Sequence, residues 1–171
     1  MQRKTYISNN QISLVEYLPS DDKNSYNDWL DIETQKGYNY KFNETYDNFS
    51  KSGIRQRFYS TIILNSDNTI IGNIAISPIN SIPDLAIRIY KPYRKQGYGT
   101  MAFMLGTKYA VDILRLDEIH AGCYQDNISS LKMLEKCGYI PFPEGNQNEK
   151  HFLTGEEIVQ LDFIYIKKQN P

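Results

Sequence analysis

The pattern of hydrophobic and polar positions divides the chain into short segments with either strand or helix periodicity. Two β-rich runs, at 57–64 and 69–77, flank the turn-forming residues of 65–68 and so predict a hairpin. A wide apolar surface over 101–114 predicts a heavily buried helix. The remaining expected strands are 11–18, 85–90, 117–124, 139–142 and 157–167, and the remaining expected helices are 23–35, 44–51 and 127–138.

Single positions refine this series of elements. Gly37 is placed to end the helix 23–35. Gly72 lies inside a strand, where a glycine suggests a β-bulge or the close approach of another backbone. The strand 85–90 is mostly apolar, which is typical of a central strand, and the polar stretch 144–150 predicts a loop. The order β-α-(α)-β-β-β-α-β-α-β-β favours a mixed sheet with helices on its faces.

Composition narrows the class of protein. The 171 residues are 40% hydrophobic and 23% charged, which predicts one soluble domain spanning 1–171. A formal net charge of -1 argues against a nucleic-acid binder, which is usually strongly basic. Cys123 and Cys137 provide no disulfide framework and favour a reduced, cytoplasmic protein. No run approaches the roughly 18 consecutive apolar residues of a membrane span, so we expect neither a membrane nor a nucleic-acid partner.

The stretch 91–100 holds the clearest chemical signal. It follows an apolar strand and precedes a helix, so free backbone N–H groups and the positive end of a helix dipole surround one point. Gly97 and Gly99 permit close backbone approach, and Arg94 and Lys95 add charged donors. These features predict a site for a phosphate-bearing ligand, although an ordinary turn with solvated basic residues has the same composition. No Gly-Lys-Ser/Thr follows the turn, which disfavours a P-loop.

Two motifs in separate parts of the chain resemble one known family. The first is a turn of the form Arg-x-x-Gly-x-Gly at 94–99. The second is a helix that starts with Asn-x-x-Ser at 127–130 and ends with Leu-Glu-Lys-Cys-Gly-Tyr at 134–139. In this element order they resemble the GNAT superfamily of acetyl-CoA-dependent N-acetyltransferases, over residues 11–168. Leu134 and the ending 155–163 are similar to the branch that acetylates N-termini of ribosomal proteins.

The resemblance implies a single-domain, GNAT-like α+β (mixed α/β) fold, with a twisted, mixed, mostly antiparallel sheet of about six to seven strands and helices on both faces. It implies acetyl-CoA as co-substrate and no metal. Backbone N–H groups of 95–100 are expected to hold the pyrophosphate, and backbone groups of 85–90 to pair with the pantetheine arm and to supply a donor for the thioester oxygen. An N-cap role alone would also explain Asn127. The coenzyme ligands implied in this way are Ile89, Tyr90, Arg94, Lys95, Gln96, Gly97, Tyr98, Gly99, Thr100, Asn127 and Ser130.

The chain departs from the family at the leaving group. Many members carry a tyrosine in the helix 127–138 that protonates the departing thiolate, and Leu134 occupies that position here. A thiol with a pKa of roughly 8.5 is a tolerable leaving group near neutral pH without such an acid. The amine must also lose a proton, and the candidate general bases are Asp84, His120 and Glu33, each of which has a purely structural explanation as well.

The acceptor site is expected in 26–50, which is rich in aromatic residues, and in 143–154. Tyr38 and Tyr40 are the expected substrate-binding residues, because tyrosine offers an apolar ring and a polar tip. We therefore predict direct acetyl transfer from acetyl-CoA to a primary amine in a ternary complex, by a monomer or homodimer. The amine is a protein N-terminus or a small molecule such as an amino sugar or a polyamine. A catalytically weak acetyl-CoA-binding module and an unrelated nucleotide-binding domain are the alternatives.

Overall fold

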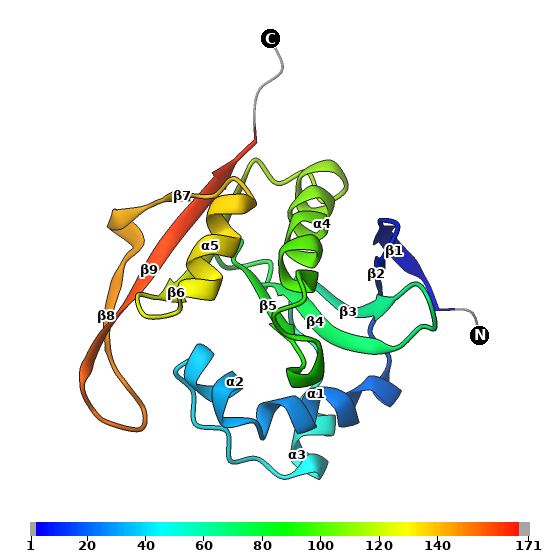
Figure 1. Cartoon of the computed structure of the whole chain (residues 1–171), viewed down its shortest axis with the longest axis horizontal. Coiled ribbons are helices and arrows are strands. Elements are labelled where there is room, and N and C mark those ends of the chain that lie inside the picture. The colour runs from blue at the N-terminus through cyan, green and yellow to red at the C-terminus, as the bar shows by residue number, and fades with distance from the viewer. Residues whose placement is uncertain (1–2, 168–171) are drawn as a thin grey trace.

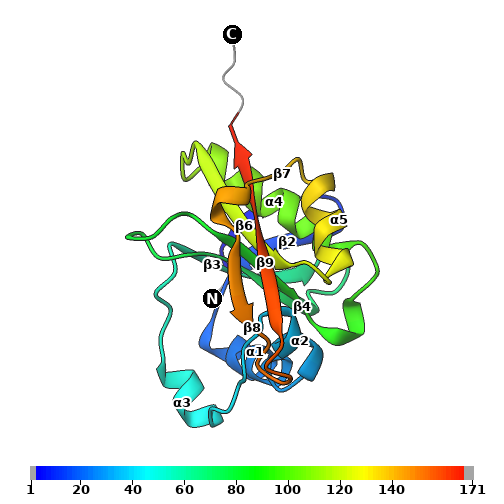
Figure 2. The same cartoon turned by 90° about the vertical axis from the view of Figure 1, so that its left-hand side faces the viewer.

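The strands form two antiparallel sheets in the computed structural model, which describes residues 3–167 (Figure 1). The first sheet contains β1 to β5 in chain order. The second has the order β6-β9-β7, with β8 also paired to β9, and Figure 2 looks onto it with the long β9 at its centre. The strands are β1 (Thr5–Ser8), β2 (Ile12–Glu16), β3 (Phe58–Leu64), β4 (Ile70–Ile76), β5 (Leu85–Ile89), β6 (Glu118–Tyr124), β7 (Ile140–Pro141), β8 (Gln147–Lys150) and β9 (Glu157–Ile166).

Helices cover both faces of the first sheet. Adjacent residues of a strand point to opposite faces, and Asn73 contacts Ser25 of α1 whereas Ile74 lies against Gly106 of α4. Within residues 3–167 no helix has the length and apolarity needed to span a membrane. The helices are α1 (Asp22–Trp29), α2 (Ile32–Gly37), α3 (Tyr46–Lys51), α4 (Tyr98–Asp112) and α5 (Ile128–Lys136), with 3-10 turns at Pro19–Asp21, Lys91–Tyr93 and Pro143–Gly145.

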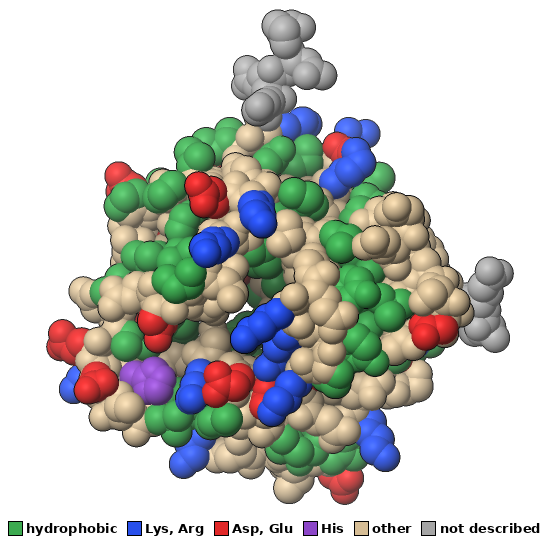
Figure 3. Space-filling view, in the orientation of Figure 1, with side chains coloured by type: hydrophobic (Ala, Val, Ile, Leu, Met, Phe, Trp, Pro, Cys, Tyr) green, Lys and Arg blue, Asp and Glu red, His purple; other side chains and the backbone are tan. Residues whose placement is uncertain are grey.

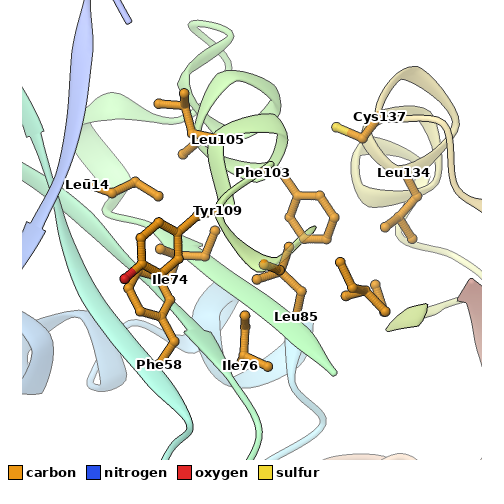
Figure 4. Packing of buried hydrophobic residues seen from close by; sticks show 14 of the residues in the cluster. Leu14, Phe58, Ile74, Ile76, Leu85, Phe103, Leu105, Tyr109, Leu134 and Cys137 are labelled. Atoms are coloured by element: carbon orange, nitrogen blue, oxygen red, sulfur yellow. The ribbon is translucent and has the colours of Figure 1, made fainter. Parts of the chain in front are cut away.

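The main core lies between α4 and the first sheet (Figure 4). Ile74 and Leu85 of the sheet meet Phe103 of α4, and all three side chains are fully buried. Burial of one such side chain contributes about 1.5–3 kcal/mol. Leu134 of α5 extends the same cluster toward the second sheet. This packing confirms the buried helix predicted from 101–114, and it fixes α4 on one side of β5.

The two sheets meet at a single point and diverge from there. Asp84 and His120 form an isolated parallel bridge, in which the His120 N–H donates to the Pro83 carbonyl at 2.7 Å. Beyond this bridge, β5 is the last strand of its sheet, and no strand of the described residues pairs with its second edge. The expectation that 85–90 is central was therefore wrong. Its apolar side chains are covered by helices rather than by neighbouring strands, and its backbone edge stays open.

Gly72 lies at an irregularity of the hairpin, as the sequence predicted. The β3–β4 register shifts between Ile62 and Ile63, opposite Gly72. A Cβ on Gly72 would overlap the carbonyl oxygen of Arg88 on β5. Only glycine therefore allows β4 and β5 to approach each other here, and both expected features, the bulge and the close backbone approach, are confirmed.

Other boundaries differ from the sequence prediction. The helix expected over 23–35 is interrupted, because Asp31 adopts an extended conformation (ψ 123°) and starts α2 as its N-cap. The stretch 144–150 is only in part a loop, since its residues 147–150 form β8, which pairs with β9 along its whole length. Its side chains are largely exposed on both faces, so no hydrophobic alternation marks it. The strand β1 was not predicted at all, and the strands number nine within residues 3–167.

Candidate active site

A cleft of about 730 Å³ lies between the diverging strands β5 and β6. Figure 3 shows this face hollowed near its centre, with Lys and Arg side chains beside the opening. Its walls come from α2, the turn before α4 and the first part of α5. Of the residues expected from the sequence, it brings together Glu33, Tyr38, Asp84, Ile89, Arg94, Lys95, Gly97, Gly99, Thr100, Asn127 and Ser130; Tyr40, Tyr90, Gln96, Tyr98 and His120 do not line it.

The free edge of β5 forms one side of this cleft. The Tyr90 N–H donates to the Ile71 carbonyl of β4 at 2.8 Å, so alternate residues of β5 turn their backbone groups away from β4. Ile87 and Ile89 are those residues, and both line the cleft. The expected backbone contact at Tyr90 is thus corrected: its N–H is already engaged within the sheet. The edge offers the N–H groups of Ile87 and Ile89 instead.

The glycine turn leads directly into the N-terminus of α4. Gly97 has φ 87° and Lys95 has φ 61°, so the chain reverses through two left-handed residues before the helix begins at Tyr98. No side chain within residues 3–167 caps this helix end. The Met101 N–H is the first to bond back, to the Gly97 carbonyl, which leaves the preceding N–H groups without intrahelical partners. The strand-turn-helix geometry predicted for an anion site is present.

Arg94 is oriented toward the N-terminal helices. Its Nη1 donates to Asp31 at 2.6 Å, its Nη2 to Asp28 at 3.0 Å and to Thr34 at 2.7 Å, and its Nε to the Ile89 carbonyl at 2.8 Å. Gln96 likewise points back into the turn, where its amide donates to Pro92. Lys95, in contrast, is exposed and makes no hydrogen bond or ion pair to the described residues. Roles for these side chains toward a coenzyme stay predictions.

Asn127 is the N-cap of α5, as expected. Its side-chain oxygen accepts the Ser130 N–H at 3.1 Å. Leu134 is 1% exposed and lines the cleft, so the position of the family tyrosine carries no hydroxyl. Tyr139 is buried, with its hydroxyl 2.9 Å from that of Thr107, and it does not line the cleft.

His120 is poorly suited to act as a general base. Its Nδ1 lies 2.8 Å from Asp162 and its Nε2 lies 2.8 Å from Glu118. Burial lowers the pKa of His120, but hydrogen bonds to both carboxylates outweigh burial and raise the pKa above its ordinary value. An imidazolium that donates from both ring nitrogens has no lone pair with which to accept a proton.

Asp84 has the properties of a base that faces the cleft. It lies where the two sheets meet, and burial raises the pKa of Asp84 to about 6, with a further contribution from the Asp162 carboxylate. It is therefore mostly ionised at neutral pH and close to the range in which proton transfer is efficient. Glu33 also lines the cleft, but its side chain is 59% exposed and pairs with Lys36 at 2.8 Å.

The acceptor end contains contacts that the sequence gave no sign of. Tyr38 donates its hydroxyl to the Ile87 carbonyl at 2.9 Å. Asn39, in a left-handed conformation (φ 46°), donates to the Glu149 carboxylate at 3.0 Å and so links the chain after α2 to β8. Tyr124 donates to the same carboxylate at 2.8 Å. These contacts join residues far apart in the chain, and of the residues involved Tyr38 and Tyr124 line the cleft. Tyr40, expected there, is exposed and packs against Trp29 instead.

Several solved structures with a similar fold are described as acetyltransferases. A spermidine N-acetyltransferase from Vibrio cholerae, in complex with CoA and spermine, is 17% identical with a TM-score of 0.82, covering 92% of this chain and 96% of that chain. A GNAT-family acetyltransferase from Bacillus anthracis is 19% identical with a TM-score of 0.78, covering 94% and 97%. A Vibrio cholerae protein assigned as a ribosomal-protein-serine acetyltransferase is 15% identical with a TM-score of 0.69, covering 95% and 97%. These likenesses confirm the predicted fold.

Sequence comparison leads to the family itself. A search among curated proteins finds no match. The family model of the acetyltransferase (GNAT) domain matches residues 11–140, a range that includes the glycine turn and α5. Because this model covers well over half of the chain, the protein belongs to the GNAT family of acetyltransferase enzymes.

Proposed function

We propose that this enzyme transfers the acetyl group of acetyl-CoA to a primary amine, by direct attack within a ternary complex. The observation that carries the proposal is the cleft between β5 and β6, which joins an open strand edge to an uncapped helix N-terminus. Family membership supports the donor. The Vibrio cholerae spermidine N-acetyltransferase solved with CoA and spermine supports a small-molecule amine, while a protein N-terminus is the other acceptor class. We further propose that the chain works as one cytoplasmic domain, as a monomer or homodimer.

The residues of the cleft fit an acyl-CoA donor. N–H groups at the start of α4, together with Lys95, suit a pyrophosphate. The backbone edge at Ile87 and Ile89 suits the amides of a pantetheine arm, because an open strand edge pairs with any extended amide chain. When bound, acetyl-CoA supplies the activated acyl group and a thiol leaving group.

Asp84 takes the role of general base in this proposal. It lines the cleft close to the point where the two sheets meet. Its carboxylate accepts the proton that the amine nitrogen loses, directly or through one water. His120 contributes to the surroundings of Asp84, since the bridge between them holds Asp84 in place. No residue is assigned as an acid for the leaving thiolate, because Leu134 has no titratable group.

The second candidate function is an acetyl-CoA-binding module with weak turnover. The observation that favours it is Leu134, buried in the cleft wall where many family members place a tyrosine. Calorimetry with acetyl-CoA, followed by thiol release with spermidine, an amino sugar and peptides with free N-termini, separates the two functions. Binding with turnover of at least one amine supports the enzyme. Binding without turnover supports the module, and absence of binding contradicts both.

Asp84→Asn is expected to slow acetylation and to remove an ionisation from the rate profile. A positioned base contributes about 10²-fold or more, so we expect kcat/KM to fall by at least about that factor. In the wild type, kcat/KM should rise with pH through an inflection near the pKa of Asp84, which burial raises to about 6. Initial rates between pH 5 and pH 9 measure both effects. Glu33→Gln is the comparison, and loss of the inflection in that variant would make Glu33 the base.

The same substitution should make the folded protein more stable at neutral pH. Because burial raises the pKa of Asp84 to about 6, the folded protein holds a proton that the unfolded chain has released between about pH 4 and pH 6. Stability from this group is therefore lost as pH rises through that window. Asn carries no such charge, so Asp84→Asn should raise the free energy of unfolding at pH 7 by about 2 kcal/mol, measured by urea denaturation. Unchanged stability would show that Asp84 is solvated in the folded protein.

A further inference from the structure

The guanidinium of Arg94 joins the glycine turn to the N-terminal helices. Four of its five N–H donors are engaged: one by the Ile89 carbonyl and three by the carboxylates of Asp28 and Asp31 and the hydroxyl of Thr34. These partners come from the end of β5, from α1, from the break between the helices and from α2. One side chain of the turn thus contacts α1, the break and α2, which together hold residues 33–38 at the cleft; this segment is called the acceptor wall below.

Charge balance keeps Arg94 in this position. Asp28 has a side chain that is 2% exposed, and it pairs with Arg94 at 3.0 Å and with Arg88 at 3.3 Å. Arg88 is itself buried, held by Ser25 and Asn73 and stacked 4.4 Å from the centre of the Trp29 ring. If Arg94 turned toward a phosphate, Asp31 would lose its closest cation and Asp28 would be left with one arginine. A buried carboxylate opposes such a loss of its partner.

We propose that Arg94 is a positioning residue for the acceptor wall, and not a ligand of the donor's phosphates. The proposal rests on the function proposed above, since it concerns which half of the cleft this residue serves. The helix α2 carries Glu33, Thr34 and Lys36 into the cleft, with Tyr38 directly after it, yet it has only six residues. A helix this short needs tertiary contacts to be stable, and Arg94 provides two of them, to Asp31 and Thr34.

Lys95, the next residue, is the cation suited to the donor. It lines the cleft, its side chain is exposed, and it has no hydrogen-bond or ion-pair partner among residues 3–167. Two adjacent residues of the turn therefore have different tasks: Arg94 positions the acceptor wall, and Lys95 faces the phosphates of the donor. This division also explains why position 94 needs arginine. Only a planar fork with five donors reaches Asp28, Asp31 and Thr34 together. A lysine would keep the charge and lose the fork.

Arg94→Lys and Lys95→Gln form the test, each compared with the wild-type chain. We expect Arg94→Lys to bind acetyl-CoA within about threefold of the wild-type Kd in calorimetry, while amide exchange over 32–38 speeds up by about tenfold or more. Lys95→Gln should weaken acetyl-CoA by about tenfold, lower the salt dependence of binding and leave exchange over 32–38 unchanged. With spermidine as the amine, Arg94→Lys should raise KM by about fivefold or more and change kcat by less than about threefold.

The opposite pattern would overturn the proposal: weakened acetyl-CoA binding by Arg94→Lys with unchanged exchange over 32–38. Asp31→Asn is the second variant, because it weakens the pairing of Arg94, and the weaker contact of Lys91 at 3.5 Å, while every residue of 91–100 stays unchanged. It should reproduce the faster exchange, and its effect should not add to that of Arg94→Lys. If the wild type acetylates no amine, the proposed function fails, yet exchange and acetyl-CoA affinity still test the position of Arg94.

Discussion

Gly99→Glu abolishes acetyl-CoA binding while the protein stays folded: this is the largest functional effect that we expect. A Cβ at Gly99 would lie 3.7 Å from Ile89 and from Met133, which is ordinary contact, so the substitution fits the fold. A carboxylate in the first turn of α4 even stabilises the helix, by about 0.3–1 kcal/mol. It would, however, occupy the N–H groups and repel the phosphates. Calorimetry should show a Kd at least about 100-fold weaker, or about 2.7 kcal/mol.

Two variants at the same position separate the effect of charge from the effect of size. Gly99→Gln has the size of the glutamate without its charge, and Gly99→Ala adds only a Cβ. We expect Gly99→Ala to weaken binding least, with Gly99→Gln in between, and all three to unfold at denaturant concentrations no lower than the wild type. Unchanged affinity for acetyl-CoA in Gly99→Glu would contradict the assignment of the phosphates to this turn.

Gly72→Ala should be the most destabilising of the substitutions considered. The new Cβ would overlap the Arg88 carbonyl oxygen and lie 3.2 Å from the Ile89 Cα, and both are backbone atoms of a strand covered by helices. Neither strand can move without breaking the β4–β5 ladder, so we expect a loss of about 3–5 kcal/mol in the free energy of unfolding, measured by urea denaturation. Displacement of Arg88 would also disturb its contacts with Ser25 and Asp28 of α1.

Gly37→Ala is the matched control for this measurement. A Cβ on Gly37 meets no atom within 4 Å, and the residue lies in α2 with an ordinary φ. Alanine is the better helix former, so we expect stability to be unchanged or higher by up to about 1 kcal/mol. Equal stability of Gly72→Ala and Gly37→Ala would show that β4 and β5 can separate without cost.

The sequence by itself determined the features that depend on local backbone geometry. Gly72 and Gly97 stand out because other residues rarely approach another backbone so closely, as at Gly72, or adopt a left-handed conformation, as at Gly97. Asn127 marked the start of α5 through a bond to Ser130, three residues away. The hairpin followed from two β-rich runs around a turn, and α4 followed from its wide apolar surface. The strand, turn and helix start proposed as the donor site could therefore be predicted, with the family resemblance suggesting the identity of the donor.

Tertiary structure alone decided the acceptor side. Arg94 and Asp31 are 63 positions apart, and Asn39 and Glu149 are 110 apart, so no spacing rule connects them. The break before α2 depends on the pairing of Asp31 with Arg94, and the open edge of β5 depends on where β6 diverges. The role of His120 changed for the same reason, since Asp162 of the neighbouring strand β9 binds one ring nitrogen while Glu118, two residues away on β6, binds the other. Backbone conformation and local hydrogen bonds depend on residues that are neighbours in the sequence. The charge and solvation around a side chain depend on which distant segments the fold brings beside it.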